Sequence, residues 1–255
     1  MLMQKHRTSI LGLAIALTVS GCGGAGDSNP ATTPTATSSS AEGLWSGSTN
    51  TNRTITGVVL DDDTYYFLYS VPANPKLIAG VVQGNSTSNN GSFTSANAKD
   101  FNIEGLGARS ATISGNYTAR QSLSGSLTYS GGVVQTFTST FEPGYDTTPS
   151  LASLAGTYTG QAGSSGGVQS ATVTIASDGT FTGVEASGCS FTGTATPRVH
   201  GNIFDLSISI GGAPCTFAGS TLVGIAYFDV LNSRLYAATP TSDRTDSVIF
   251  LGTKP

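Results

Sequence analysis

The sequence has few charged residues and a single tryptophan. Asp, Glu, Lys and Arg make up 10% of its 255 residues, against about 25% in an ordinary globular protein. The net charge is −4 at neutral pH, and no segment concentrates Lys and Arg. This excludes the basic patch that a nucleic-acid-binding surface needs, and it argues against charge-driven binding of the folded part to anionic membranes.

Segments that favour a helix are also scarce. Gly occurs 33 times, and each interior Gly costs a helix about 1 kcal/mol relative to Ala. Ser, Thr and Asn are frequent and compete for the helix backbone. Strand-like runs, such as residues 54–60 and 65–69, recur instead between clusters of turn residues. This pattern predicts an all-β protein built as a sandwich or a barrel.

The N-terminal segment has the layout of an export signal. Lys5 and Arg7 precede an apolar run over residues 9–19, which is shorter than the about 20 residues of a spanning helix. The run ends in Val-Ser-Gly-Cys at residues 19–22, which resembles the lipobox of bacterial lipoproteins. The resemblance implies that residues 1–21 are removed and that Cys22 becomes the lipidated first residue. An ordinary signal peptide cut nearby, with the cysteine incidental, is the alternative.

The residues after the lipobox predict an anchor and a tether. Gly23 follows Cys22, whereas in enterobacterial lipoproteins an aspartate there retains the protein in the inner membrane. The resemblance therefore implies the outer membrane, with the periplasmic or outer face left open. Residues 22–41 contain almost no apolar side chains, so they cannot offset their ordering entropy and should form a flexible tether. Apart from the covalent lipid, we expect no cofactor.

Cysteine is rare as well, with three residues in the chain. With Cys22 assigned to lipid, Cys189 and Cys215 are left as a pair in an oxidising compartment, which predicts a disulfide. Two free buried thiols are the alternative. A metal site is disfavoured because the nearby His200 gives no recognisable ligand spacing.

The folded part is interpreted as a duplicated module. Gly43-Leu44-Trp45 is echoed by Gly156-Thr157-Tyr158, and the segment 78–81 is echoed by 191–194 at the same offset. Several such landmarks in one order predict two copies, with 101–103 and 204–206 as matching strands. The predicted organisation is a signal peptide at 1–21, a tether at 22–41, an N-terminal β domain at 42–142, a linker at 143–150 and a C-terminal β domain at 151–255.

Each half should hold about eight short antiparallel strands. Closure into a barrel would leave no exposed edge, although a two-sheet sandwich stays open. The Gly-x-aromatic starts at Trp45 and Tyr158 resemble the Gly-x-Trp of lipocalin and avidin-type barrels, where the aromatic ring plugs one end. The anchor, tether and tandem barrels also resemble transferrin-binding-protein-B-like and factor-H-binding-like surface lipoproteins. With one tryptophan, the tryptophan-lined biotin site of avidins has no counterpart.

Several polar residues are candidates for chemistry. The acidic run 61–63 could bind calcium, but its repeat partner is a turn, which favours a solvated hairpin tip. His200 with Asp205 could serve a hydrolase only beside a nucleophile, and a surface histidine is favoured. Paired carboxylates for glycoside hydrolysis would have to come from the glutamates of the folded part, which are Glu42, Glu104, Glu142 and Glu185.

The densest aromatic group lies in residues 65–69. Strand alternation places Tyr65, Phe67 and Tyr69 on one face, with Tyr66 and Leu68 on the other. One face should be core and the other a half-covered outer face, or an aromatic platform for a sugar or a protein.

Taken together, these features predict a non-catalytic binding or adhesion module, anchored to the cell envelope by lipid, whose partner is a protein, a glycan or a small molecule. We expect no catalytic residue and no metal. The alternative is a small-molecule carrier with its ligand in a barrel lumen, which needs an internal cavity of about 300 Å³ or more. A hydrolase is the third hypothesis.

Overall fold

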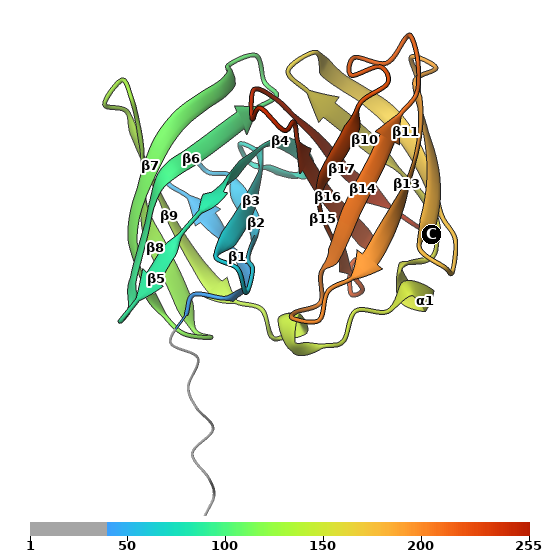
Figure 1. Cartoon of the computed structure of the whole chain (residues 1–255). Coiled ribbons are helices and arrows are strands. Elements are labelled where there is room, and N and C mark those ends of the chain that lie inside the picture. The colour runs from blue at the N-terminus through green and yellow to red at the C-terminus, as the bar shows by residue number, and fades with distance from the viewer. Residues whose placement is uncertain (1–39) are drawn as a thin grey trace, which may run out of the picture. The chain divides into compact units, whose positions relative to one another are not determined.

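The computed structural model describes residues 40–255, which belong to one compact unit (Figure 1). The predicted export signal, Cys22 and all of the predicted tether except Ser40 and Ala41 lie outside the described residues. Among the described residues, no helix is both long and apolar enough to cross a membrane.

The first half of this unit is a closed antiparallel barrel. Its sheet runs in the order β4-β3-β2-β1-β9-β8-β7-β6-β5, and pairing of β4 with β6 closes the ring of eight strands with β5 appended. The strands are β1 (Gly43–Thr49), β2 (Thr54–Val59), β3 (Thr64–Val71), β4 (Asn74–Asn85), β5 (Thr87–Asn89), β6 (Ser92–Asn102), β7 (Gly107–Thr118), β8 (Ser122–Tyr129) and β9 (Val134–Phe141). The segment 101–103, predicted as a separate strand, is instead the end of β6 and the residue after it, because β6 continues past a register shift between Ser95 and Ala98.

The second half is a closed barrel of eight strands in sequential order. They are β10 (Gly156–Ser164), β11 (Gly167–Ile175), β12 (Thr180–Glu185), β13 (Ser190–Pro197), β14 (Phe204–Ile210), β15 (Thr221–Asp229), β16 (Arg234–Pro240) and β17 (Ser247–Thr253). Two short helical turns, η1 (Pro143–Asp146) and α1 (Leu151–Leu154), connect the barrels. The predicted tandem barrels are confirmed, and the sandwich alternative is wrong for both halves.

The echoed aromatic residues plug equivalent ends of the two barrels. Trp45 is fully buried, and its indole N–H donates to the carbonyl of Ala41 at 3.0 Å. Tyr158 is also fully buried, and its hydroxyl donates to the carbonyl of Leu154 at 2.6 Å. Each donor thus bonds a carbonyl four residues earlier, where the chain enters the barrel. A buried aromatic with a polar tip needs such a partner, and both barrels supply one from the same place in the chain.

The two barrels share an apolar core along their outer faces. One cluster of buried residues joins Tyr66 and Leu68 of β3 with Ile225 of β15 and Ile249 of β17. The predicted alternation is confirmed, since Tyr65 and Phe67 lie in the other cluster, inside the first barrel. The outer face is neither half-covered nor a platform: Tyr66 is 8% exposed and Leu68 is 5% exposed, because the second barrel covers them.

Polar contacts frame this shared core. The guanidinium of Arg244 donates to the backbone carbonyls of Gln83 and Asn97, each at 2.9 Å. Arg198 of the second barrel donates to Asp61 of the first at 2.7 Å. The barrels are therefore tied by both apolar packing and hydrogen bonds that involve charged groups, so neither outer face is a free surface at this point.

Candidate functional site

Aromatic rings fill the interior of the first barrel. The Phe67 ring stacks on Tyr65 with centroids 5.2 Å apart and lies 6.3 Å from Phe93 and 5.9 Å from Phe137. Strand alternation directs all four side chains inward, and all are buried. A residual cavity of about 50 Å³ remains near Phe67 and Phe137, at the end opposite Trp45.

A polar network closes that end of the first barrel. The carboxylate of Asp100 is 1% exposed and accepts three hydrogen bonds: from Tyr69 Oη at 2.6 Å, from Tyr129 Oη at 2.7 Å and from Arg109 Nη2 at 2.7 Å. The guanidinium of Arg109 also lies over the Tyr129 ring, 4.1 Å from its centroid. Burial, and then the negative charge of Asp100, raise the pKa of both tyrosines. Both hydroxyls therefore stay protonated and donate to Asp100.

The network extends to the rim through two more contacts. Asn102 Nδ2 donates to Tyr69 Oη at 3.2 Å, and Arg53 forms an ion pair with Glu104 at 2.7 Å. We call the set of Arg53, Tyr69, Asp100, Asn102, Glu104, Arg109 and Tyr129 the lid of the first barrel. The carboxylate at the centre of the lid is satisfied within the lid, because Asp100 accepts from Tyr69, Tyr129 and Arg109.

Strand register makes the two barrels comparable residue by residue. In each barrel the plugging aromatic pairs with a residue of the second strand, which pairs in turn with a residue of the third. The matching series are Trp45, Gly57 and Phe67 in the first barrel and Tyr158, Val173 and Gly183 in the second.

The second barrel lacks the lid in this register. The position of Tyr69 is taken by Glu185, since the two pair with the matching residues Ile55 and Ala171. The position of Asp100 is taken by Ile210, through the pairs Val82–Asp100 and Phe191–Ile210. A barrel with an isoleucine where the central carboxylate would stand cannot assemble the same network.

A cavity of about 80 Å³ occupies the lumen of the second barrel. Its walls include four small inward residues, its floor is Leu154 of α1, and polar side chains stand at the opposite end. The small wall residues contribute to the free volume, because an Ala side chain fills less of a barrel interior than a larger side chain would. The wall residues are Ala162, Ala195, Ala226 and Ala237, and the polar residues at the mouth are Ser164, Gln169, Glu185 and Thr216.

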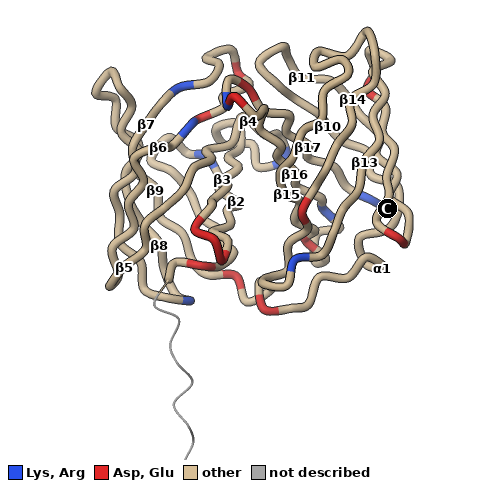
Figure 2. Tube along the Cα trace, in the orientation of Figure 1, with Lys and Arg blue, Asp and Glu red and all other residues tan. Residues whose placement is uncertain are grey.

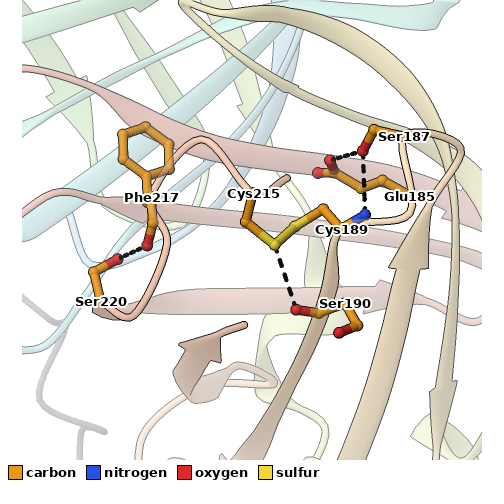
Figure 3. The surroundings of a disulfide bond; sticks show 7 residues. All are labelled: Glu185, Ser187, Cys189, Ser190, Cys215, Phe217 and Ser220. Carbon is orange, nitrogen blue, oxygen red and sulfur yellow. Dashed lines mark hydrogen bonds between the residues drawn. A yellow bond between two sulfur atoms is a disulfide. The ribbon is translucent and has the colours of Figure 1, made fainter. Parts of the chain in front are cut away.

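A disulfide braces the mouth of this cavity (Figure 3). Cys189, which contributes to the cavity wall, is bonded to Cys215 with an S–S distance of 2.03 Å, so the predicted pair is confirmed. The bond ties the turn between β12 and β13 to the loop between β14 and β15, which carries the rim residue Phe217. In the same turn the hydroxyl of Ser187 lies 3.4 Å from Glu185 Oε2 and accepts the backbone N–H of Cys189.

The residues considered for hydrolysis or metal binding have other partners. Asp205 accepts from Arg198 at 2.7 Å, and the His200 side chain is 58% exposed with Glu42 at 3.9 Å. In the run 61–63, Asp61 bonds the same Arg198, which lowers the pKa of that carboxyl chiefly by hydrogen bonding. No group of three His, Cys, Asp or Glu side chains within residues 40–255 is placed to hold a metal ion.

The glutamates considered for glycoside hydrolysis lie on different parts of the fold. Glu104 pairs with Arg53 in the lid of the first barrel, Glu185 stands at the mouth of the second, and Glu142 follows β9 at the end of the first barrel that Trp45 plugs. Charged residues are sparse throughout, as the mostly uncharged trace of Figure 2 shows.

Comparison with known proteins assigns no family to this sequence. No protein family model and no curated protein matches the sequence. Among solved structures, the chain is similar to isotype 1 transferrin-binding protein B from serogroup B Neisseria meningitidis, with 10% identity and a TM-score of 0.29 over 80% of this chain. The matched region spans 66% of that protein. The assignment of two barrels therefore rests on the strand pairing of this protein itself.

Proposed function

We propose that this protein is a non-catalytic binding protein held at the outer membrane by a lipid on Cys22, and that its second barrel is the binding module. The single observation that carries the proposal is the contrast between the two lumens. The first keeps a cavity of about 50 Å³ beside a polar lid that contains Arg53 and Arg109, whereas the second keeps an apolar cavity of about 80 Å³ whose wall contains no Lys, Arg or His.

The volume of the cavity limits the size of ligand that the carrier hypothesis allows. A volume of about 80 Å³ is below the about 300 Å³ of a pocket for a drug-sized ligand. It is several times the about 10 to 15 Å³ that one water occupies by the same measure. The ligand would therefore be small or would reach out through the mouth, and a carrier of a large enclosed ligand is not supported.

Binding in the lumen is tested with a short 1-alkanol as an apolar probe. Titration calorimetry should show 1-hexanol binding to residues 40–255, and Ala237→Phe should abolish it because the six carbon atoms of the added ring fill the cavity. Thr192→Phe is the matched control, since Thr192 is exposed on the outer face of β13. Equal binding by both variants, or no binding by the wild type, would refute the lumen as the site.

The anchor is tested separately. Radiolabelled palmitate should enter the wild type and should not enter Cys22→Ser, and the unlabelled variant should leave the membrane fraction. Protease shaving of intact cells then decides which face of the outer membrane carries the barrels. Equal labelling of the two forms would contradict the proposed anchor without bearing on the lumen.

Exposed aliphatic side chains support surface adhesion as a second candidate function. Val199 and Leu231 are each 95% exposed, and Val230 is 61% exposed. They lie in the β13–β14 and β15–β16 connections, at the end of the second barrel that Tyr158 plugs. If adhesion is the function, a triple substitution to Ser at these positions should weaken attachment of cells to a surface while leaving 1-hexanol binding unchanged.

A further inference from the structure

The mouth of the second barrel carries a carboxylate with no cation beside it. Glu185 is the last residue of β12, and alternation from the buried Phe181 directs its side chain inward. Its carboxylate accepts a 3.4 Å hydrogen bond from Ser187. Within residues 40–255, no Lys, Arg or His lies within ion-pair distance of Glu185, and none contributes to the cavity wall.

The surrounding loop adds negative charge to the same end of the barrel. The connection between β16 and β17 contains Asp243 and Asp246, which are held by hydrogen bonds from Thr241 and Ser165 respectively. The one cation of this connection, Arg244, points to the backbone of the first barrel. An anionic ligand head at this mouth would therefore meet like charges, whereas a cationic head would meet an unpaired carboxylate.

We propose that the second barrel binds a slender alkyl chain with an amine head, the chain lying in the lumen and the ammonium group at Glu185. This inference rests on the proposed function and names the ligand class of the same site. The length of the bound alkyl chain follows from the volume of the cavity. A volume of about 80 Å³ holds about five to eight water-sized groups, which corresponds to an alkyl chain of about five to eight carbons.

The lumen predicts a dependence on chain length. Each methylene transferred from water to an apolar cavity gains about 0.8 kcal/mol, which is roughly fourfold in affinity. The affinity of 1-aminoalkanes should therefore rise about fourfold per carbon from four carbons and level off at about six to eight, where the chain fills the lumen and further carbons reach water.

The mouth predicts a dependence on the head group. For chains of six carbons, calorimetry at pH 7 should give the order amine, alcohol, carboxylate, with at least about a tenfold difference between the first and the last. In Glu185→Gln the difference should fall below about threefold. Glu142→Gln is the matched control, because it removes the same charge far from this mouth and should keep the full preference.

The outcomes separate this inference from the proposed function. If the alcohol binds in the lumen but the carboxylate binds as well as the amine, or if Glu185→Gln keeps the full preference, the amine assignment is overturned and the lumen site stands. If no alkyl compound binds and Ala237→Phe behaves like the wild type, the lumen site itself is overturned.

Discussion

Removing the carboxylate of Asp100 should destabilise the first barrel more than any surface change. In Asp100→Ala the hydroxyls of Tyr69 and Tyr129 lose their acceptor, and the Arg109 guanidinium loses its ion pair. An orphaned buried donor costs about 1 to 3 kcal/mol, and breaking a buried ion pair from one side costs about 3 to 5 kcal/mol. Since the Arg109 side chain is 32% exposed, water recovers part of its loss. We expect a total of about 3 to 5 kcal/mol.

The assay uses the only tryptophan of the chain. Trp45 plugs the first barrel, so its fluorescence during urea unfolding reports that barrel, while far-ultraviolet circular dichroism reports both. Asp100→Ala should lower the free energy of unfolding seen by fluorescence by the stated amount, and the melting temperature by roughly 10 °C for a protein of this size. Asp100→Asn keeps one acceptor oxygen and should cost about half as much.

A double-mutant cycle isolates the pair from the rest of the network. Arg109→Ala alone should be costly because it leaves Asp100 buried without its cation, whereas the loss in the double variant should be smaller than the sum of the two single losses. A loss below about 1 kcal/mol for Asp100→Ala, or strictly additive losses, would show that the lid is not a coupled network.

Three other outcomes follow from the structure. Replacing Cys189 and Cys215 together by Ser should lower the free energy of unfolding by about 3 to 4 kcal/mol by the chain-entropy estimate, and the urea midpoint of this variant should match that of the reduced wild type. Equal urea midpoints for the oxidised and the reduced wild type would contradict this prediction. Leu68→Ala should lower the free energy of unfolding by about 2 to 5 kcal/mol, since Leu68 is 5% exposed between the barrels. It should also separate the unfolding transition seen by fluorescence from the one seen by dichroism. A loss confined to tenths of a kcal/mol would mean that the barrels do not support each other. Hydrogen bonding to Arg198 lowers the pKa of Asp61 from its ordinary value of 3.8. The Asp61–Arg198 pair therefore stabilises the folded state above pH 3.8, and this stabilisation is lost as the pH falls through the lowered pKa. Asp61→Asn should accordingly flatten the decline in melting temperature measured between pH 5 and pH 3.

Local chemistry was enough to predict much of the fold. Alternating polar and apolar residues, turn residues between them and a paired Gly-x-aromatic start predicted two small antiparallel modules, and Trp45 and Tyr158 do occupy matching ends. The disulfide between Cys189 and Cys215 was predictable because the predicted assignment of Cys22 to a lipid left only these two cysteines to pair. Strand alternation also separated Tyr65 and Phe67 from Tyr66 correctly, because it depends only on the backbone pleat.

The part of the protein that covers an apolar strand face could not be predicted in the same way. Tyr66 and Leu68 were expected to be half-exposed, and they are buried because another barrel packs on them. That contact joins residues of β3 with residues of β15 and β17, far apart in the sequence. No local pattern marks an apolar outer face as an interface and not as a ligand platform, since both require the same side chains.

The sequence by itself therefore determined the class of fold, the repeated module and the disulfide, because each depends on neighbours along the chain or on a simple count, while the plugs at Trp45 and Tyr158 were implied by a resemblance to other barrels. Only the tertiary structure decided that one barrel carries a polar lid and the other does not. That difference depends on which inward residues face one another around a ring of strands. Pairing across β3, β4 and β6 brings Tyr69 beside Asp100, while the same register across β12, β13 and β14 sets Glu185 and Ile210 around an unfilled lumen.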